Sequence, residues 1–235
     1  MHPYPLPPRG TSLLSLHPHE ALPGLVPSPS MGRAQMATMI VHDRRLKGAT
    51  PLNYNYVKVV GPGVSIASVI GSVAHYGASK PLDVLHILCH GYEANWNLGD
   101  QTCTPNAAGG FGLQLCAEGL TLFNATLTSR WRGRVGRIVL FACAPADTGP
   151  GNAGTGGDGR RFCGELALWS DAEVIAARDT QYYNTVPAHY SGSRTVGNTI
   201  DFGAWEGPVY SFTPDVPGGT VINPAAYNMA NPAAM

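Results

Sequence analysis

The sequence predicts an α/β protein with a mostly parallel sheet, helices on both faces and a C-terminal β-hairpin. From residue 54 onward, short apolar runs alternate with segments of helical periodicity, as in repeated βαβ units. The runs at residues 82–89 and 137–142 are apolar on both faces, which is typical of covered parallel strands. Residues 199–214 instead alternate around two glycines, and this pattern predicts an antiparallel hairpin appended to the core.

The first predicted unit is a strand at residues 54–60, a helix at 64–76 and a strand at 82–89. The helix follows from apolar residues at i, i+3 and i+4 spacing, namely Ile66, Val69, Ile70, Val73 and Ala74. Strand, helix and strand over so short a stretch form a βαβ unit.

The second predicted unit begins with the segment GGFGLQL, which we expect to form a short hairpin arm. A helix at residues 118–131 then leads to a strand at 137–142, and a helix at 160–169 leads to a strand at 173–177. This alternation favours parallel strands joined by helical crossovers.

Proline marks both ends of the chain. It is dense in residues 1–35, where it blocks the continuous apolar helix of a secretion signal. Proline, asparagine and alanine dominate the last residues. We therefore expect a Pro-rich tail at 1–35, an α/β domain at 36–215 and a C-terminal tail at 216–235.

The charge balance restricts the partners. The chain has 15 Lys plus Arg and 15 Asp plus Glu, whereas nucleic-acid and anionic-membrane surfaces need net positive charge. Its five cysteines contain no CxxC pair and fit neither a complete disulfide framework nor a zinc site. We expect free thiols, a cytoplasmic location, no nucleic-acid or membrane partner, and no metal or organic cofactor.

Two of the predicted parallel strands end in reactive side chains. One stops at His90-Gly91 and the other at Cys143. Ligands bind at the carboxyl ends of strands in open α/β sheets, and the ends of neighbouring strands lie about 5 Å apart. A thiol and an imidazole at such ends suit nucleophilic catalysis, with the amides of Gly91 and Cys143 as an oxyanion hole.

A hydrophobic strand ending in His-Gly, then a later one ending in Ala-Cys, resembles the caspase-like cysteine peptidases, which include caspases, metacaspases, gingipains and CHAT-type proteases. The resemblance covers roughly residues 54–180 and is greatest to bacterial caspase-like domains. The matching positions are His90-Gly91, Leu98-Gly99, Cys143, Phe162, Leu166-Ala167 and Val174-Ile175-Ala176.

This resemblance implies a three-layer caspase-like fold and a cysteine endopeptidase that hydrolyses protein or peptide substrates. It makes Cys143 the nucleophile, His90 the general acid/base and Gly91 an oxyanion donor. Caspases proper have the signature Gln-Ala-Cys-x-Gly, whereas this chain has Phe-Ala-Cys-Ala-Pro at residues 141–145.

Other interpretations remain open at this point. The chain is alternatively an inactive caspase-like module that binds a protein partner. Ser65, between a strand and a helix, also imitates the nucleophile of a serine hydrolase, although serine is an ordinary N-cap residue. In the glycine-rich loop at 147–159, Asp147 and Asp158 are candidates for binding a basic substrate or calcium. That loop is a mobile wall of the site, a cleavable linker or a plain flexible connection.

Overall fold

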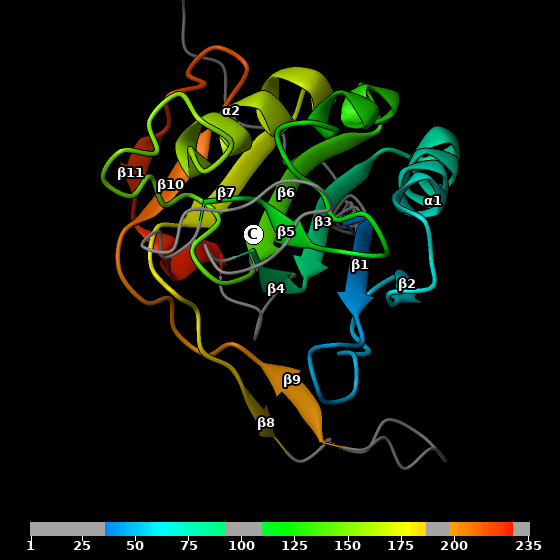
Figure 1. The fold of residues 1–235 in the computed structure, drawn as a ribbon. Coiled ribbons are helices and arrows are strands. Elements are labelled where there is room, and N and C mark those ends of the chain that lie inside the picture. Colours follow the sequence, from blue (N-terminus) through cyan, green and yellow to red (C-terminus); the bar gives the residue numbers. More distant parts are fainter. Residues whose placement is uncertain (1–35, 93–109, 187–197, 228–235) are drawn as a thin grey trace, which may run out of the picture. The chain divides into compact units, whose positions relative to one another are not determined.

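The computed structural model describes residues 36–92, 110–186 and 198–227. A seven-stranded sheet lies at its centre, with the strand order β11-β10-β7-β6-β3-β1-β2 (Figure 1). Five strands are parallel, and β10 adds antiparallel to β7 and β11 antiparallel to β10. The bounds of the seven strands are β1 Thr38–Asp43, β2 Tyr56–Val60, β3 Leu82–Leu88, β6 Val135–Phe141, β7 Glu173–Ala177, β10 Val209–Phe212 and β11 Thr220–Ile222. The predicted α/β class with a mostly parallel sheet is confirmed.

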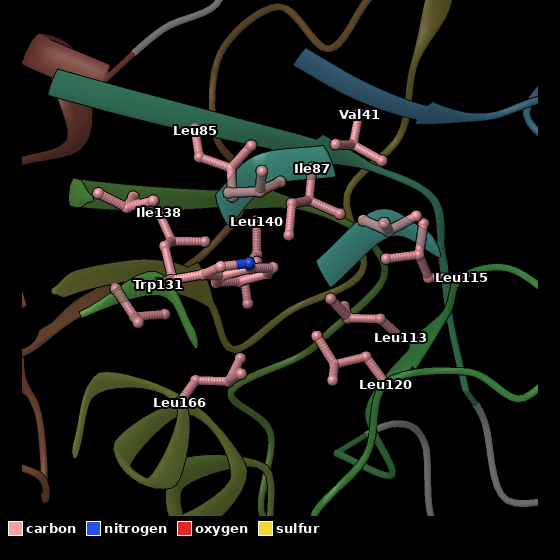
Figure 2. Packing of buried hydrophobic residues seen from close by; sticks show 14 of the residues in the cluster. Val41, Leu85, Ile87, Leu113, Leu115, Leu120, Trp131, Ile138, Leu140 and Leu166 are labelled. Atoms are coloured by element: carbon pink, nitrogen blue, oxygen red, sulfur yellow. The ribbon is translucent and has the colours of Figure 1, made fainter. Parts of the chain in front are cut away.

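One face of the sheet carries both α-helices, α1 (Ile66–Ser79) and α2 (Gly159–Ser170), together with the 3-10 helix η1 (Ala125–Trp131). Figure 2 shows Trp131 packed among side chains of β3, β6 and α2. Its indole nitrogen donates to the carbonyl of Ile70 in α1 at 3.1 Å, so one buried residue joins all three helices to the sheet.

Within the part of the chain that the structure describes, the other face of the sheet is not covered by α-helices, although helices were predicted on both faces. Its core contains Ile40, Tyr54, Phe141 and Phe202, packed with the half-buried Trp205. In the described ranges, loop segments and the 3-10 helix η2 (Pro224–Tyr227) stand where a second layer of α-helices was expected. The connection from β1 to β2 consists of turns and includes a proline, so it forms no covering helix.

Three further expectations need correction. The interior strand β1 was not predicted, although Met39-Ile40-Val41 is an apolar run. The region 199–214 is not one hairpin, because β9 (Thr199–Asp201) pairs with β8 (Asn184–Val186) in a separate sheet. The C-terminal hairpin is instead β10–β11, so the segment expected as a tail from residue 216 supplies the edge strand.

The predicted helix at 118–131 is only partly present. Gly119 has a φ of +75°, and Leu120 forms a β-bridge with Leu113. Regular structure then begins only at Ala125, as a 3-10 helix. The expected arm GGFGLQL contains β5 (Leu113–Gln114), which pairs with β4 (His90–Gly91) beside the candidate site.

Candidate active site

His90 and Cys143 follow two neighbouring strands at their carboxyl ends. β3 and β6 are parallel with Leu88 opposite Phe141, and the amide of Cys89 donates to the Phe141 carbonyl at 3.2 Å. This pairing ends at Leu88 and Phe141, and His90 and Cys143 each follow two residues later. His90 begins β4, whereas Cys143 lies in the bend after β6. The two residues therefore leave the sheet at neighbouring strand ends on the same edge.

Gly91 lies against the backbone of Cys143. A Cβ atom on residue 91 would collide with the Cys143 carbonyl oxygen and lie 2.9 Å from its carbonyl carbon. A side chain is therefore excluded at this close approach. Tyr92 donates its amide to the Gly112 carbonyl at 2.9 Å, and the alternation of an antiparallel ladder turns the Gly91 amide away from β5. That direction is compatible with the oxyanion role expected of Gly91.

The residue after Cys143 adopts an uncommon backbone conformation. Ala144 has a φ of +47°, a left-handed region that costs a residue with a side chain roughly 1–2 kcal/mol. Its amide donates to the Asp179 carbonyl at 3.2 Å, and its carbonyl accepts from Gly110 at 3.1 Å. The Ala144 amide is thus engaged within the fold, while backbone strain of this kind often accompanies functional sites.

The chain beyond β7 forms a wall beside Cys143. The Cys143 Sγ lies 3.9 Å from the Gln181 carbonyl oxygen. The Gln181 side chain is almost fully buried and brackets the backbone of Glu206, donating to its carbonyl at 2.8 Å and accepting from its amide at 3.1 Å. Trp205 stacks on Phe141 with ring centroids 4.8 Å apart. The sequence prediction did not include Gln181, which belongs to no recognisable motif; the only available signal is its place shortly after a buried strand.

The described cysteines differ in access to solvent. Cys143 is half-buried, whereas Cys89, Cys116 and Cys163 are buried free thiols. Burial raises the pKa of Cys116 to about 12 and raises the pKa of Cys89 and of Cys163 above the usual range. These three thiols stay protonated near neutral pH, which leaves Cys143 as the best placed nucleophile among the described cysteines.

A buried ion pair supports the strand that pairs with His90. Asp43, at the end of β1, is fully buried and pairs with Arg45 at 2.6 Å. Arg45 also donates to the carbonyls of Gln114 and Cys116 at 3.1 and 2.7 Å, and the Cys116 amide donates to Asp43 at 2.9 Å. The sequence prediction did not include Asp43, although a His-Asp pair directly after the apolar run Met39-Ile40-Val41 is a signal for strand-end residues.

The two aspartates of the glycine-rich loop have different environments. Asp158 is the N-cap of α2 and accepts hydrogen bonds from the amides of Arg161 and Gly154 and from the Thr148 hydroxyl. Burial alone raises its pKa, but these hydrogen bonds lower it below the usual value. Asp158 therefore organises the loop, which makes it a structural residue rather than a substrate ligand.

Asp147 lies nearer the candidate site. Burial raises the pKa of its carboxyl group, with a smaller opposing effect from Arg178 and a further increase from Asp179. Both neighbours belong to the wall that follows β7, so Asp147 is placed among residues close to Cys143.

Ser65 caps a helix. Its side chain accepts a hydrogen bond from the Ser68 amide at 3.3 Å at the start of α1. This helix follows β2, which is separated from β3 by β1 in the sheet. The N-cap contact accounts for a serine at this position.

Within residues 36–92, 110–186 and 198–227, no group of three His, Cys, Asp or Glu side chains could hold a metal ion. No helix in these same ranges is long and apolar enough to cross a bilayer. Leu98-Gly99, which matches the caspase-like pattern, and the fifth cysteine, Cys103, lie outside the described residues. Comparison of the chain with protein-family models, curated proteins and solved structures gives no match.

Proposed function

We propose that the chain is a caspase-like cysteine endopeptidase in which Cys143 is the nucleophile and His90 the general acid/base. The observation that carries the proposal is the pairing of β3 with β6, two neighbouring parallel strands that end shortly before His90 and Cys143. The close packing of Gly91 on Cys143 and the half-buried thiol support the same assignment.

The proposed reaction has two steps. In the first, the Cys143 thiolate attacks the carbonyl carbon of the scissile peptide bond, and the His90 imidazolium gives its proton to the departing amine as the C–N bond breaks. In the second, His90 takes a proton from water, the resulting hydroxide attacks the thioester, and the C–S bond breaks. The products are an amine, a carboxylic acid and the regenerated enzyme.

The carbonyl oxygen of the substrate needs stabilisation while it carries negative charge. The Gly91 amide is a suitable donor because it points away from β5, on the side of the strand that adjoins Cys143. The Ala144 amide is already bonded to Asp179 and plays no such part. The Cys143 amide remains the second donor in this proposal.

The segment after β7 suits an extended peptide. Residues 180–183 are neither helix nor strand, and Tyr182 is 71% exposed next to Gln181. An extended substrate placed along this segment brings its carbonyl group toward Cys143. The proposed substrates are therefore proteins or peptides.

Selective alkylation tests the proposal. Iodoacetamide at pH 7 should modify Cys143 much faster than Cys89, Cys116 or Cys163, as measured by peptide mass spectrometry. His90→Ala should slow modification of Cys143 while leaving the other thiols unchanged, and Cys143→Ala should abolish hydrolysis of a quenched peptide library.

Other outcomes point elsewhere. Uniform or absent labelling of the native thiols would contradict the enzyme assignment and favour the inactive binding module. Hydrolysis lost in Ser65→Ala but retained in Cys143→Ala would favour the serine hydrolase.

A further inference from the structure

Gln114 is the cross-strand partner of His90. β4 and β5 pair antiparallel with His90 opposite Gln114 and Gly91 opposite Leu113. Side chains of directly opposed residues project to the same face, with Cβ atoms about 5 Å apart. The amide of Gln114 is therefore the side chain that the β4–β5 pairing sets beside the His90 imidazole.

The carboxamide oxygen of Gln114 has no hydrogen-bond partner among residues 36–92, 110–186 and 198–227. This Oε1 atom is buried, although the residue as a whole is half-buried. A buried acceptor left in this state costs roughly 1–3 kcal/mol, so such atoms call for a physical explanation. An imidazole N–H is a donor of the right kind, and His90 lies directly across the strand pair.

The Asp43–Arg45 ion pair holds the backbone around Gln114 in place. Arg45 donates to the Gln114 carbonyl at 3.1 Å and to the Cys116 carbonyl at 2.7 Å, while Asp43 accepts from the Cys116 amide. These contacts hold Cys116 at a φ of +64°, a conformation that would otherwise be unfavourable. The ion pair thereby sets the position of β5 relative to the end of β1.

We propose that Gln114 is the positioning residue for His90: the two side chains form no hydrogen bond in the present arrangement, and a rotation of the imidazole lets the Gln114 Oε1 accept from the ring nitrogen that does not face Cys143. This inference rests on the proposed function of His90. The hydrogen bond would fix the tautomer and the ring orientation, so that the other nitrogen exchanges protons with the thiol and the leaving group. Because the amide is neutral, it orients the ring without adding charge.

Histidine NMR tests this contact independently of catalysis. The full chain carrying Cys143→Ala is labelled with 15N, and the His90 ring signals are assigned by their loss in His90→Gln. Gln114→Glu places a carboxylate within reach of the imidazolium and should raise the His90 pKa by about one unit or more. Gln114→Met removes the acceptor and should change the balance between the two neutral tautomers.

Matched controls separate a local contact from a general charge effect. Phe123 is 64% exposed and lies outside β4 and β5, and Phe123→Glu adds the same charge there. Phe123→Glu should leave the His90 pKa unchanged. None of the variants should change the pKa of His42, His75 or His86. Asp43 and Arg45 keep their ion pair in every variant, and thermal unfolding confirms that each variant is folded.

The pH dependence of hydrolysis gives the second readout. In the otherwise native chain, Gln114→Glu should move the alkaline limb of the rate profile to higher pH, because that limb reports loss of the imidazolium proton. An unchanged His90 pKa in folded Gln114→Glu, together with unchanged tautomers in Gln114→Met, overturns the role of Gln114. If these NMR signals do not change but Cys143 is still labelled selectively, only the role of Gln114 is refuted and the proposed function stands. If the NMR signals change as expected but Cys143 is not labelled selectively, only the proposed function is refuted.

Discussion

Replacing Gly91 with alanine probes the closest approach between the two strand ends. The new methyl carbon would collide with the Cys143 carbonyl oxygen and lie 2.9 Å from its carbonyl carbon, whereas ordinary contacts begin at 3.4 Å. The obstacle is backbone, so a change of side-chain rotamer cannot remove it. Relief of the clash requires a shift on the order of 1 Å between the ends of β3 and β6.

Two effects of Gly91→Ala follow from this shift. Overpacking of a close contact costs about 1–3 kcal/mol of unfolding free energy, equivalent to roughly 2–4 °C in Tm per kcal/mol for a domain of this size. Displacement of a catalytic group by about 1 Å costs on the order of 100-fold in rate. We therefore expect a Tm lower by several degrees and a loss of about 100-fold in hydrolysis.

The assay combines thermal unfolding with the rates of Cys143 alkylation and peptide hydrolysis. Gly63→Ala is the matched control, because a Cβ atom there meets nothing within 4 Å. It should leave both alkylation and hydrolysis at the native level. A Gly91→Ala protein with native Tm and native Cys143 reactivity would refute the inferred packing of the two strand ends.

Three further substitutions test structural roles. Asp158→Ala should lower the unfolding free energy by about 1 kcal/mol in urea titrations without changing Cys143 alkylation, whereas Asp158→Asn keeps the helix cap and should be nearly neutral. Arg45→Met leaves the buried Asp43 without its partner and should cost about 3–5 kcal/mol in the same measurement, with partial recovery in Arg45→Met/Asp43→Leu. Burial lowers the pKa of His86 from its usual 6.5 to about 3, so the unfolded chain binds a proton that the folded one does not. His86 thus contributes stability above pH 6.5 that is lost as the pH falls toward 3, and His86→Gln should flatten this part of a stability–pH curve; an equally steep curve in His86→Gln would contradict this assignment.

Local sequence patterns predicted the elements that carry the proposed dyad. Continuous apolar runs identified β3 and β6, and the abrupt change to His90 and Cys143 marked their ends. β3 and β6 are adjacent in the sheet, as the prediction required, so the two residues follow neighbouring strand ends. Here the chemistry lies directly after a strong local signal, which is why sequence alone indicated it.

The supporting contacts follow from the order of the strands and could not be predicted in the same way. Arg45 contacts Cys116 across 71 residues of sequence, and neither residue belongs to a motif. The helix predicted at 118–131 failed for a related reason, because the bridge from Leu120 to Leu113 ties that segment to β5. Pairing with β5 thus overrode the helical periodicity of residues 118–124.

Glycines occur near the candidate site because neighbouring chain segments leave no room for a side chain, and not only because glycine has a flexible backbone. A Cβ atom on Gly159 would lie 2.5 Å from the Pro145 carbonyl oxygen and 2.8 Å from the Asp147 amide, and the Gly159 amide donates to the Asp147 carbonyl at 2.8 Å. The loop between these residues is further tied together by Asp158. Glycine therefore allows chain segments to pack against one another here, as Gly91 does beside Cys143. These contacts argue against residues 147–159 as a mobile wall and favour a loop fixed by its own packing.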